Sequence, residues 1–211
     1  LKSYSYGPSF SQKHIKELLE SRLLEYEYYQ NIEYVAAQYL NMNFTLAWFH
    51  GRMESGPRAL GNRSILMSPR DSKNKDIVNS KIKYRESFRP FCPSILAEYA
   101  DAYFENYRNE YFMTTSFKTS AKANQIPAVV HKDLTARPQF VTKEANNRYH
   151  NLITEFYKLS GIPALLNTSF NVKGEPMICN PREAIKCFYD TGLDVLVIES
   201  FVLRKRHVPK L

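Results

Sequence analysis

Long apolar runs and paired cysteines are both missing from this chain of 211 residues. No stretch is long and apolar enough to span a membrane, and we recognise no signal peptide. The three cysteines, Cys92, Cys179 and Cys187, are odd in number and form no CxxC pair. This usage predicts reduced thiols, so we expect a cytoplasmic protein without a membrane segment.

The familiar phosphate-binding signatures are missing too. The sequence contains neither GxGxxG nor GxxxxGKS/T, and no order of serine, histidine and aspartate points to a nucleophilic triad. Lysine and arginine number 29 against 21 acidic residues, which gives a net charge of +8. A basic excess suits nucleic acid, phosphorylated small molecules or an acidic partner domain, and it does not choose among them.

The length fits one large domain or two small ones and is sufficient for a substantial core. Apolar residues make up 44% and charged residues 24%, as in ordinary globular proteins. The chain starts at a leucine and runs directly into a turn-like GPSFS segment. We therefore expect it to be a fragment of a longer protein.

Hydrophobic periodicity predicts alternating helices and strands. Gly161 and the Asn180-Pro181 pair have the residue types of a helix end and a helix start. The alternation predicts an α/β or α+β fold around one mixed, twisted sheet. Helices are expected near 15–23, 32–40, 71–82, 99–103, 144–160 and 181–191. Strands are expected near 44–49, 94–96, 111–118, 126–130, 139–142, 162–166, 195–198 and 201–203, with a further short ordered element at 64–67.

The most informative stretch runs from residue 49 to residue 90. Three glycines in it are each followed by an arginine within two residues, and a second basic cluster comes later. Glycine lets the backbone approach a ligand closely, and the guanidinium fork matches phosphate and carboxylate oxygens. We interpret the stretch as an anion pocket rather than a surface loop of solvated arginines. The residues are Gly51, Arg52, Gly56, Arg58, Gly61 and Arg63, followed by Lys83, Arg85 and Arg89.

Two short segments are expected to present polar side chains in pairs. If the chain is extended, Lys83 and Arg85 point the same way, and so do Ser169 and Asn171, with Phe170 turned to the core. Two such tips, one cationic and one neutral, would hold a phosphate and a nucleoside from opposite sides. The alternatives are a solvated strand edge for the first pair and a simple turn for the second.

Other candidates are weaker. His131 and Asp133 would orient a water, bind magnesium or hydrogen-bond their own loop, and a structural role is favoured because no further ligands accompany them. Arg137 follows in another loop. Glu54, lying among arginines, is interpreted as an orienting salt-bridge partner rather than a general base. Cys92 is expected to be buried.

Four segments together carry a family resemblance. GRMESGPRALGNRSIL, KIKYRESFRPF, HKDLTARPQFV and LLNTSFNVKGEP resemble the signature segments of the C-terminal domain of O-carbamoyltransferases, the enzymes of nodulation-factor and antibiotic carbamoylation. The resemblance covers nearly the whole chain from Gly7 onward. That domain is similar to the YrdC family, whose Lys-x-Arg and Ser-x-Asn pairs match Lys83/Arg85 and Ser169/Asn171.

The resemblance implies that residues 1–211 form one YrdC-like domain, a twisted mixed β-sheet flanked by helices with a concave basic face. It implies binding of ATP and carbamoyl phosphate, with formation of carbamoyl adenylate and release of pyrophosphate. Magnesium would accompany ATP, held mainly by phosphates, with no metal site on the chain itself. A separate N-terminal domain, which this sequence does not resemble, would transfer the carbamoyl group to a hydroxyl acceptor.

By the same resemblance, Lys83, Arg58 and Arg89 are the catalytic candidates, acting by electrostatic stabilisation without a side-chain nucleophile. The chain departs from the family pattern at Ser55, Lys132 and Leu134, and the last two concern loop geometry. The full set expected to bind ATP and substrate is Arg58, Asn62, Arg63, Lys83, Arg85, Arg89, Arg137, Ser169 and Asn171, with Asn62 and Arg63 supporting the loop.

Two other functions compete with this interpretation. A basic concave face would also suit an RNA-binding module, and a purely structural interface domain would bind no ligand. Arginines gathered around one cavity favour a small anion, whereas arginines spread along a groove among aromatics favour RNA. We expect the chain to bind nucleotide, and we predict that it cannot carbamoylate an acceptor alone.

Overall fold

The computed structural model describes residues 4–211, and its centre is an eight-stranded mixed sheet. The strand order is β1-β10-β9-β2-β3-β8-β4-β7, with β2/β9 and β4/β7 parallel and the other neighbours antiparallel. The strands are β1 (Glu27–Tyr28), β2 (Leu46–Phe49), β3 (Arg63–Met67), β4 (Cys92–Leu96), β7 (Gln139–Val141), β8 (Ala164–Ser169), β9 (Val195–Ile198) and β10 (Phe201–Arg204). A separate hairpin pairs β5 (Phe117–Lys118) with β6 (Thr135–Ala136).

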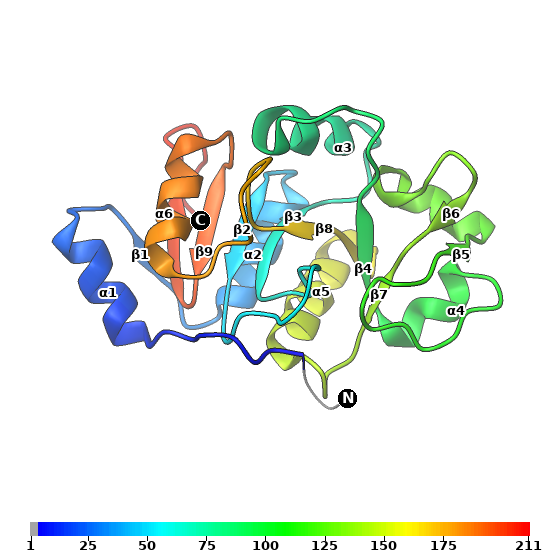
Figure 1. The fold of residues 1–211 in the computed structure, drawn as a ribbon, viewed down its shortest axis with the longest axis horizontal. Helices are drawn as coiled ribbons and strands as arrows, with labels where there is room; N and C mark the ends of the chain where they lie inside the picture. Colours follow the sequence, from blue (N-terminus) through cyan, green and yellow to red (C-terminus); the bar gives the residue numbers. More distant parts are fainter. Residues whose placement is uncertain (1–3) are drawn as a thin grey trace.

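Helices lie on both faces of this sheet. In Figure 1, α2 and α5 lie behind it, whereas α6 crosses in front of β9. The α-helices are α1 (Gln12–Ser21), α2 (Ile32–Asn41), α3 (Lys73–Val78), α4 (Ala100–Tyr103), α5 (Asn147–Ser160) and α6 (Pro181–Asp190). Short 3-10 turns span Ala97–Tyr99, Ala121–Gln125 and Pro127–Val129, and a π-helical stretch spans Asn79–Lys83.

The predicted class, a mixed sheet flanked by helices, is confirmed. Every residue of β2 and β9 is buried, because these paired central strands have helices on both sides. The cap predictions hold as well. Gly161 ends α5 in the left-handed region, at φ 73°, and Asn180 begins α6 with a capping box. None of the helices in residues 4–211 combines the length and apolar character that a membrane crossing requires.

One predicted strand, 126–130, is wrong, and another, 111–118, is right only at its end. In the segment 126–130, Pro127 begins a 3-10 turn, and the amide of Ala128 donates to the carbonyl of Pro69 instead of to a strand. Only the end of 111–118 is a strand, because the carboxylate of Glu110 accepts from the Phe112 amide and the chain turns. The alternation of apolar and polar residues did not predict these turns, because one depends on a proline and the other on a side-chain hydrogen-bond acceptor.

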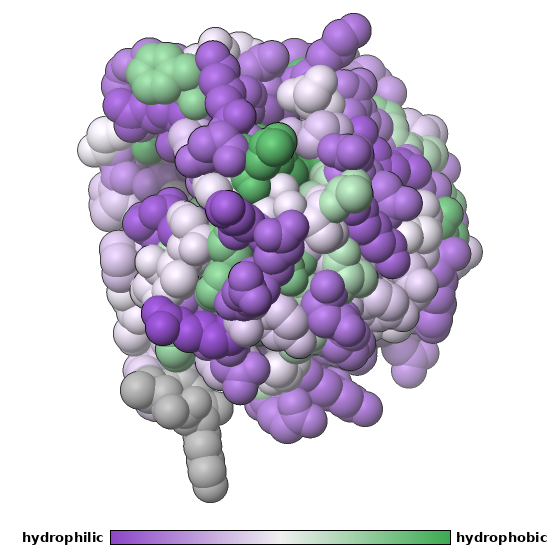
Figure 2. Space-filling view, turned by 90° about the vertical axis from the view of Figure 1, so that its right-hand side faces the viewer, coloured by the Kyte–Doolittle hydropathy of each residue, from purple (hydrophilic) through white to green (hydrophobic). Residues whose placement is uncertain are grey.

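The second of these segments belongs to the end of the molecule beyond β7. There α4 and the β5–β6 hairpin lie beside the outermost strand (Figure 1). Figure 2 views this end and shows mostly hydrophilic residues with small apolar patches between them. The Phe117 ring stacks on Phe140 of β7 at 6.1 Å between centroids, so the hairpin covers the sheet edge with apolar side chains turned inward.

Candidate functional site

The loop of residues 50–62, which we call the arginine loop, leaves β2 and returns as β3. Gly61 lies at φ +102°, and a Cβ built on it would come within 2.2 Å of the Tyr149 ring in α5. The loop therefore lies directly on an aromatic side chain, at a spacing and a backbone angle that only glycine tolerates.

Glu54 fixes the loop from inside. Its side chain is buried, and one carboxylate oxygen, Oε1, accepts the backbone amides of Leu60, Asn62 and Arg63 at 2.7–3.2 Å. The predicted orienting role is right, but the partner was wrong: among residues 4–211 the carboxylate makes no ion pair with an arginine. These three amides point inward at Glu54 and are not available to an anion.

Asn62 and Arg63 support the loop, as expected for them. The Arg63 guanidinium is fully buried, lies 3.5 Å from the Phe49 ring centroid and donates to the carbonyls of His50 and Gly51. Burial lowers its pKa to about 10. Asn62 donates to the Arg52 carbonyl at 2.7 Å. Neither residue lines the two arginine hollows described next, and the bonds that both make hold the loop.

Two adjacent hollows share a wall made by Arg58 and Arg137. The larger, about 320 Å³, has a more apolar lining, and the smaller, about 140 Å³, is more polar. No carboxylate lines either one. The smaller is lined by Pro57, Arg58, Ala59, Arg85, Pro90, Phe91, Cys92, Met113, Arg137, Asn167, Thr168 and Ser169. The larger adds Ser55, Gly56, Leu60, Phe112 and Thr114 to Pro57, Arg58, Met113 and Arg137.

Three arginines thus converge on the smaller hollow from separate parts of the chain. Arg85 lies over the Phe91 ring at 4.7 Å and donates from Nε to Asn79, which holds its guanidinium in place. Arg137 donates to the Cys92 sulfur at 3.6 Å. Cys92 is buried, as expected. Burial and the neighbouring Arg89 lower the pKa of Arg85. Like charges that crowd together without carboxylates favour a bound anion.

Lys83 lies behind the Ser169 tip rather than in either hollow. Its side chain is buried, and its ammonium donates to the Ser169 carbonyl and to both oxygens of Asn171, the latter at 2.9 and 2.7 Å. Burial, with a smaller contribution from Arg85, lowers its pKa to about 7. Lys83 therefore orders the backbone that presents Ser169 to the smaller hollow.

The Ser169–Asn171 pair has the predicted geometry. The Ser169 hydroxyl donates to the Asn171 side-chain oxygen at 2.7 Å, while Phe170 between them is fully buried. The other pair does not. Lys83 ends the π-helical stretch and Tyr84 is left-handed at φ 47°, so Lys83 and Arg85 are not neighbours on an extended segment. Lys83 turns inward, whereas Arg85 reaches the smaller hollow.

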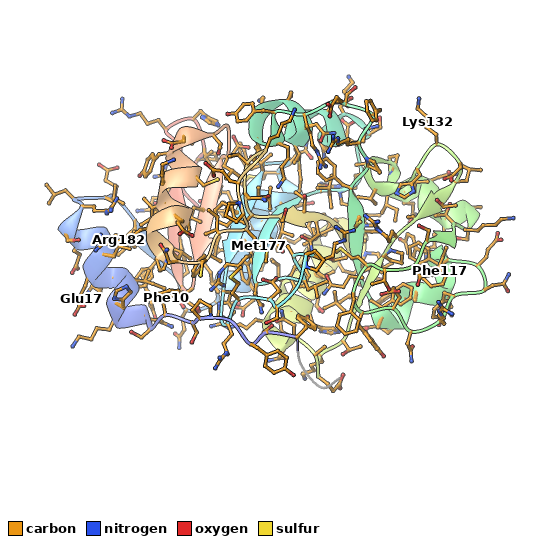
Figure 3. All side chains as sticks on the ribbon, in the orientation of Figure 1. Phe10, Glu17, Phe117, Lys132, Met177 and Arg182 are labelled. Atoms are coloured by element: carbon orange, nitrogen blue, oxygen red, sulfur yellow. The ribbon has the colours of Figure 1, made fainter. Side chains whose placement is uncertain are left out.

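The remaining candidates lie outside the hollows. The Arg89 side chain is half exposed and pairs with Glu86 at 2.9 Å. His131 and Asp133 both hydrogen-bond Thr135, at 3.1 Å and 2.8 Å to its hydroxyl, which fits the loop-holding role favoured for them. The departure at Lys132 is harmless to this arrangement, since its side chain extends into solvent (Figure 3).

Sequence reasoning missed three buried polar residues under the arginine loop. Asn167 donates to the Ala59 carbonyl and to the Ser94 hydroxyl, at 3.1 and 2.9 Å. Gln139 donates to the Leu60 carbonyl at 2.9 Å and accepts from Ser94. All three polar residues lie in or beside predicted strands that are otherwise apolar. A polar residue at such a position was the one feature of the sequence that could have indicated a buried hydrogen-bonding role. They hold the loop carbonyls next to Arg58.

A third hollow of about 440 Å³ lies between Tyr84 and α6. Glu175, Glu183 and Asp190 line it together with Lys186 and no arginine, so its charge does not suit an anion. No group of three His, Cys, Asp or Glu side chains within residues 4–211 is arranged to hold a metal ion. Magnesium bound with ATP at the arginine hollows would find no carboxylate there, and phosphate oxygens would be its ligands.

Comparison with known proteins shows the family of the chain. Residues 37–205 match the family described as carbamoyltransferase C-terminus. The chain belongs to this carbamoyltransferase C-terminal family. An uncharacterized protein of Synechocystis is 39% identical over 97% of the chain, and nodulation protein NolO of Bradyrhizobium diazoefficiens is 41% identical over 95%. The chain spans 37% and 38% of these two proteins, a little over a third of their length.

Solved structures confirm the expected YrdC-like fold. The chain is similar to full-length HypF in its phosphate- and nucleotide-bound form, with a TM-score of 0.56 over 81% of this chain and 25% of HypF. HypF of T. kodakarensis gives the same TM-score over 84% of the chain. At 14% and 13% identity these similarities concern the fold alone.

Proposed function

We propose that this chain is the part of a carbamoyltransferase that binds ATP and carbamoyl phosphate and forms carbamoyl adenylate. One observation carries the proposal. Arg58, Arg85 and Arg137 meet around a hollow that no carboxylate lines, beside the Ser169 tip that Lys83 orders from behind. A second hollow on the other side of Arg58 and Arg137 offers room for the rest of the ligands.

The residue types suit adenylation. A carbamate oxygen attacks the α-phosphorus of ATP, the bond to the β-phosphate oxygen breaks, and pyrophosphate leaves. The carbamate comes from carbamoyl phosphate, which first loses its phosphoryl group to water as inorganic phosphate. Both phosphate and pyrophosphate are therefore products. Negative charge moves between oxygens throughout, and fixed guanidinium groups stabilise it without a side-chain nucleophile. Magnesium supplies further charge neutralisation when bound with ATP.

Transfer of the carbamoyl group to a hydroxyl acceptor is assigned to another part of the protein. The family relatives are much longer than this chain, and the arginine hollows contain no group placed to activate an acceptor hydroxyl. Convergence of the arginines on one small hollow also favours a small anion over RNA, which would need cations spread along a groove. Binding to RNA with a steep salt dependence would favour the alternative.

The test is calorimetric titration of the chain with ATP and with carbamoyl phosphate, repeated on Arg58→Ala and Arg137→Ala. Each lost charge-assisted hydrogen bond is worth roughly 1.5–3 kcal/mol, so we expect affinity to fall by about 10-fold or more. Arg22→Ala, an exposed arginine beside α1, is the matched control. Incorporation of labelled pyrophosphate into ATP, dependent on carbamoyl phosphate, tests the chemistry. Unchanged affinity in both site variants would refute the placement.

A further inference from the structure

The segment of residues 4–8, which we call the leading segment, runs along the arginine loop. It forms a short antiparallel pairing with it: the Ser55 amide donates to the Tyr4 carbonyl at 2.8 Å, and the Gly7 amide donates to Met53 at 2.9 Å. The Met53 amide returns a bond to the Pro8 carbonyl at 3.0 Å. In Figure 1 this segment is the dark blue ribbon that passes beneath the cyan loop.

Side chains of the arginine loop hold the leading segment as well. Asn62 donates to the Ser5 hydroxyl at 2.6 Å, and the Arg52 guanidinium donates to the Tyr6 carbonyl at 2.8 Å. Backbone and side chains therefore bind the two segments together along the whole length of residues 4–8. A displacement of one must displace the other or break several hydrogen bonds.

The Tyr4 side chain extends from the leading segment to the residues that line the two arginine hollows. Its side chain is 6% exposed and belongs to a small apolar cluster with Leu60, Cys92 and Met113, separate from the main core. Its hydroxyl donates to the Leu60 carbonyl at 3.2 Å, and its ring meets Phe112 edge-on at 6.0 Å. Leu60, Met113 and Phe112 line the larger arginine hollow, and Cys92 and Met113 line the smaller.

Gly7 shows how closely the two segments lie. A Cβ at this position would come within 2.7 Å of the Met53 Cβ and 2.9 Å of the Met53 carbonyl oxygen. Backbone on the Met53 side cannot give way easily, because Met53 is held by hydrogen bonds in both directions. A single methyl group at residue 7 would therefore separate the leading segment from the arginine loop.

From these contacts we infer that the leading segment is a positioning element of the anion site, with Tyr4 as its positioning residue. Tyr4 packs against residues that line both hollows and fixes the position of Leu60. It thereby also fixes the position of Arg58, two residues earlier in the arginine loop. The inference rests on the proposed function for the identity of the ligand.

The experiment compares Tyr4→Ala, Tyr4→Phe and Gly7→Ala by calorimetric titration with ATP and with carbamoyl phosphate. We expect Tyr4→Ala and Gly7→Ala to weaken binding about 10-fold. The first removes the packing against residues that line the hollows, and the second displaces the arginine loop at Met53. Tyr4→Phe keeps the ring in the cluster and loses one hydrogen bond, so its affinity should stay within about threefold of the parent chain. Rescue by phenylalanine identifies packing under the hollow as the cause.

Gly161→Ala is the stability control. Its φ of +73° makes alanine strained there, yet no atom lies within 4 Å of the added Cβ and the position is the far end of α5. It should lower the melting temperature without changing ligand affinity. The positioning role would be overturned if, at equal loss of stability, Tyr4→Ala lost no more ligand affinity than Gly161→Ala.

Hydrogen exchange provides a second readout that needs no ligand. The Leu60, Asn62 and Arg63 amides that donate to Glu54 should exchange faster in Tyr4→Ala and Gly7→Ala, while amides of β9 remain protected. Unchanged exchange in the loop would refute the inference even if affinity fell. If the parent chain bound neither ligand, the proposed function would fail, and the exchange data would still decide whether the leading segment positions the loop.

Discussion

Lys83 makes the stability of this protein depend on pH in an unusual direction. An unfolded chain releases the proton of a lysine near pH 10.5, whereas burial lowers the pKa of Lys83 to about 7 in the folded state. Between these values the unfolded state binds more protons than the folded state. The free energy of unfolding must therefore rise as pH increases from about 7, and this contribution levels off above 10.5.

The magnitude follows from the two pKa values. At pH 7 about half of the folded molecules carry the buried charge, and at pH 8.5 almost none do. Linkage over this interval gives a gain of about 1.5 kcal/mol in the free energy of unfolding. The pH range for measuring this gain ends near pH 8.5, because Cys187 has an opposite effect above it. Burial raises the pKa of Cys187 from 9.0 to about 11, so the free energy of unfolding falls as the thiol of the unfolded chain ionises.

Urea denaturation at pH 7.0, 7.75 and 8.5 measures this gain in the parent chain and in two variants. Lys83→Met should abolish the rise, whereas Lys81→Met, an exposed lysine of the same π-helical stretch, should keep it. A flat profile in the parent chain would refute the reasoning. It would mean that the three oxygens around the ammonium, from Ser169 and Asn171, stabilise its charge enough to offset burial.

Two further predictions concern how the arginine loop is held. Gly61→Ala should lower the free energy of unfolding by about 3 kcal/mol, because its Cβ would overlap the Tyr149 ring at a strained φ. Gly56→Ala, also at positive φ but with no atom within 4 Å, should cost clearly less in the same urea titration; equal losses would contradict the packing argument. Asn167→Ala should cost about 1–3 kcal/mol, because it leaves the buried Ala59 carbonyl without its donor. A loss below about 0.5 kcal/mol in thermal or urea unfolding would show that the loop is held by other contacts.

The candidate site was predictable where residue type alone decides. Arg58 and Arg85 were named from guanidinium chemistry in the stretch 49–90, and Arg137 was added by the family resemblance; all three line the smaller hollow. Ser169 and Asn171 were placed on one side of an extended tip by strand geometry, and they hydrogen-bond each other. Apart from Arg137, these inferences needed only the local backbone and the hydrogen-bonding groups of each side chain.

Other roles depended on partners far away in the sequence. Lys83 looked like a ligand-facing cation, yet it faces the Ser169 and Asn171 carbonyls 86 and 88 residues away. Glu54 looked like a partner for arginine, and it accepts backbone amides instead. In both cases the residue type indicated only that Lys83 would donate and Glu54 would accept hydrogen bonds, and the partners were fixed by chain segments that only folding brings together.

The sequence by itself determined the order of most helices and strands, the caps at Gly161 and Asn180, and the family through four long motifs. These features are local, since they follow from periodicity and from the backbone preferences of single residues. Tertiary structure alone decided which cations face the hollows, which are buried behind them, and that Tyr4 lies beneath the site. Burial and hydrogen-bond partners are properties of segments packed together, and spacing along one chain does not specify them.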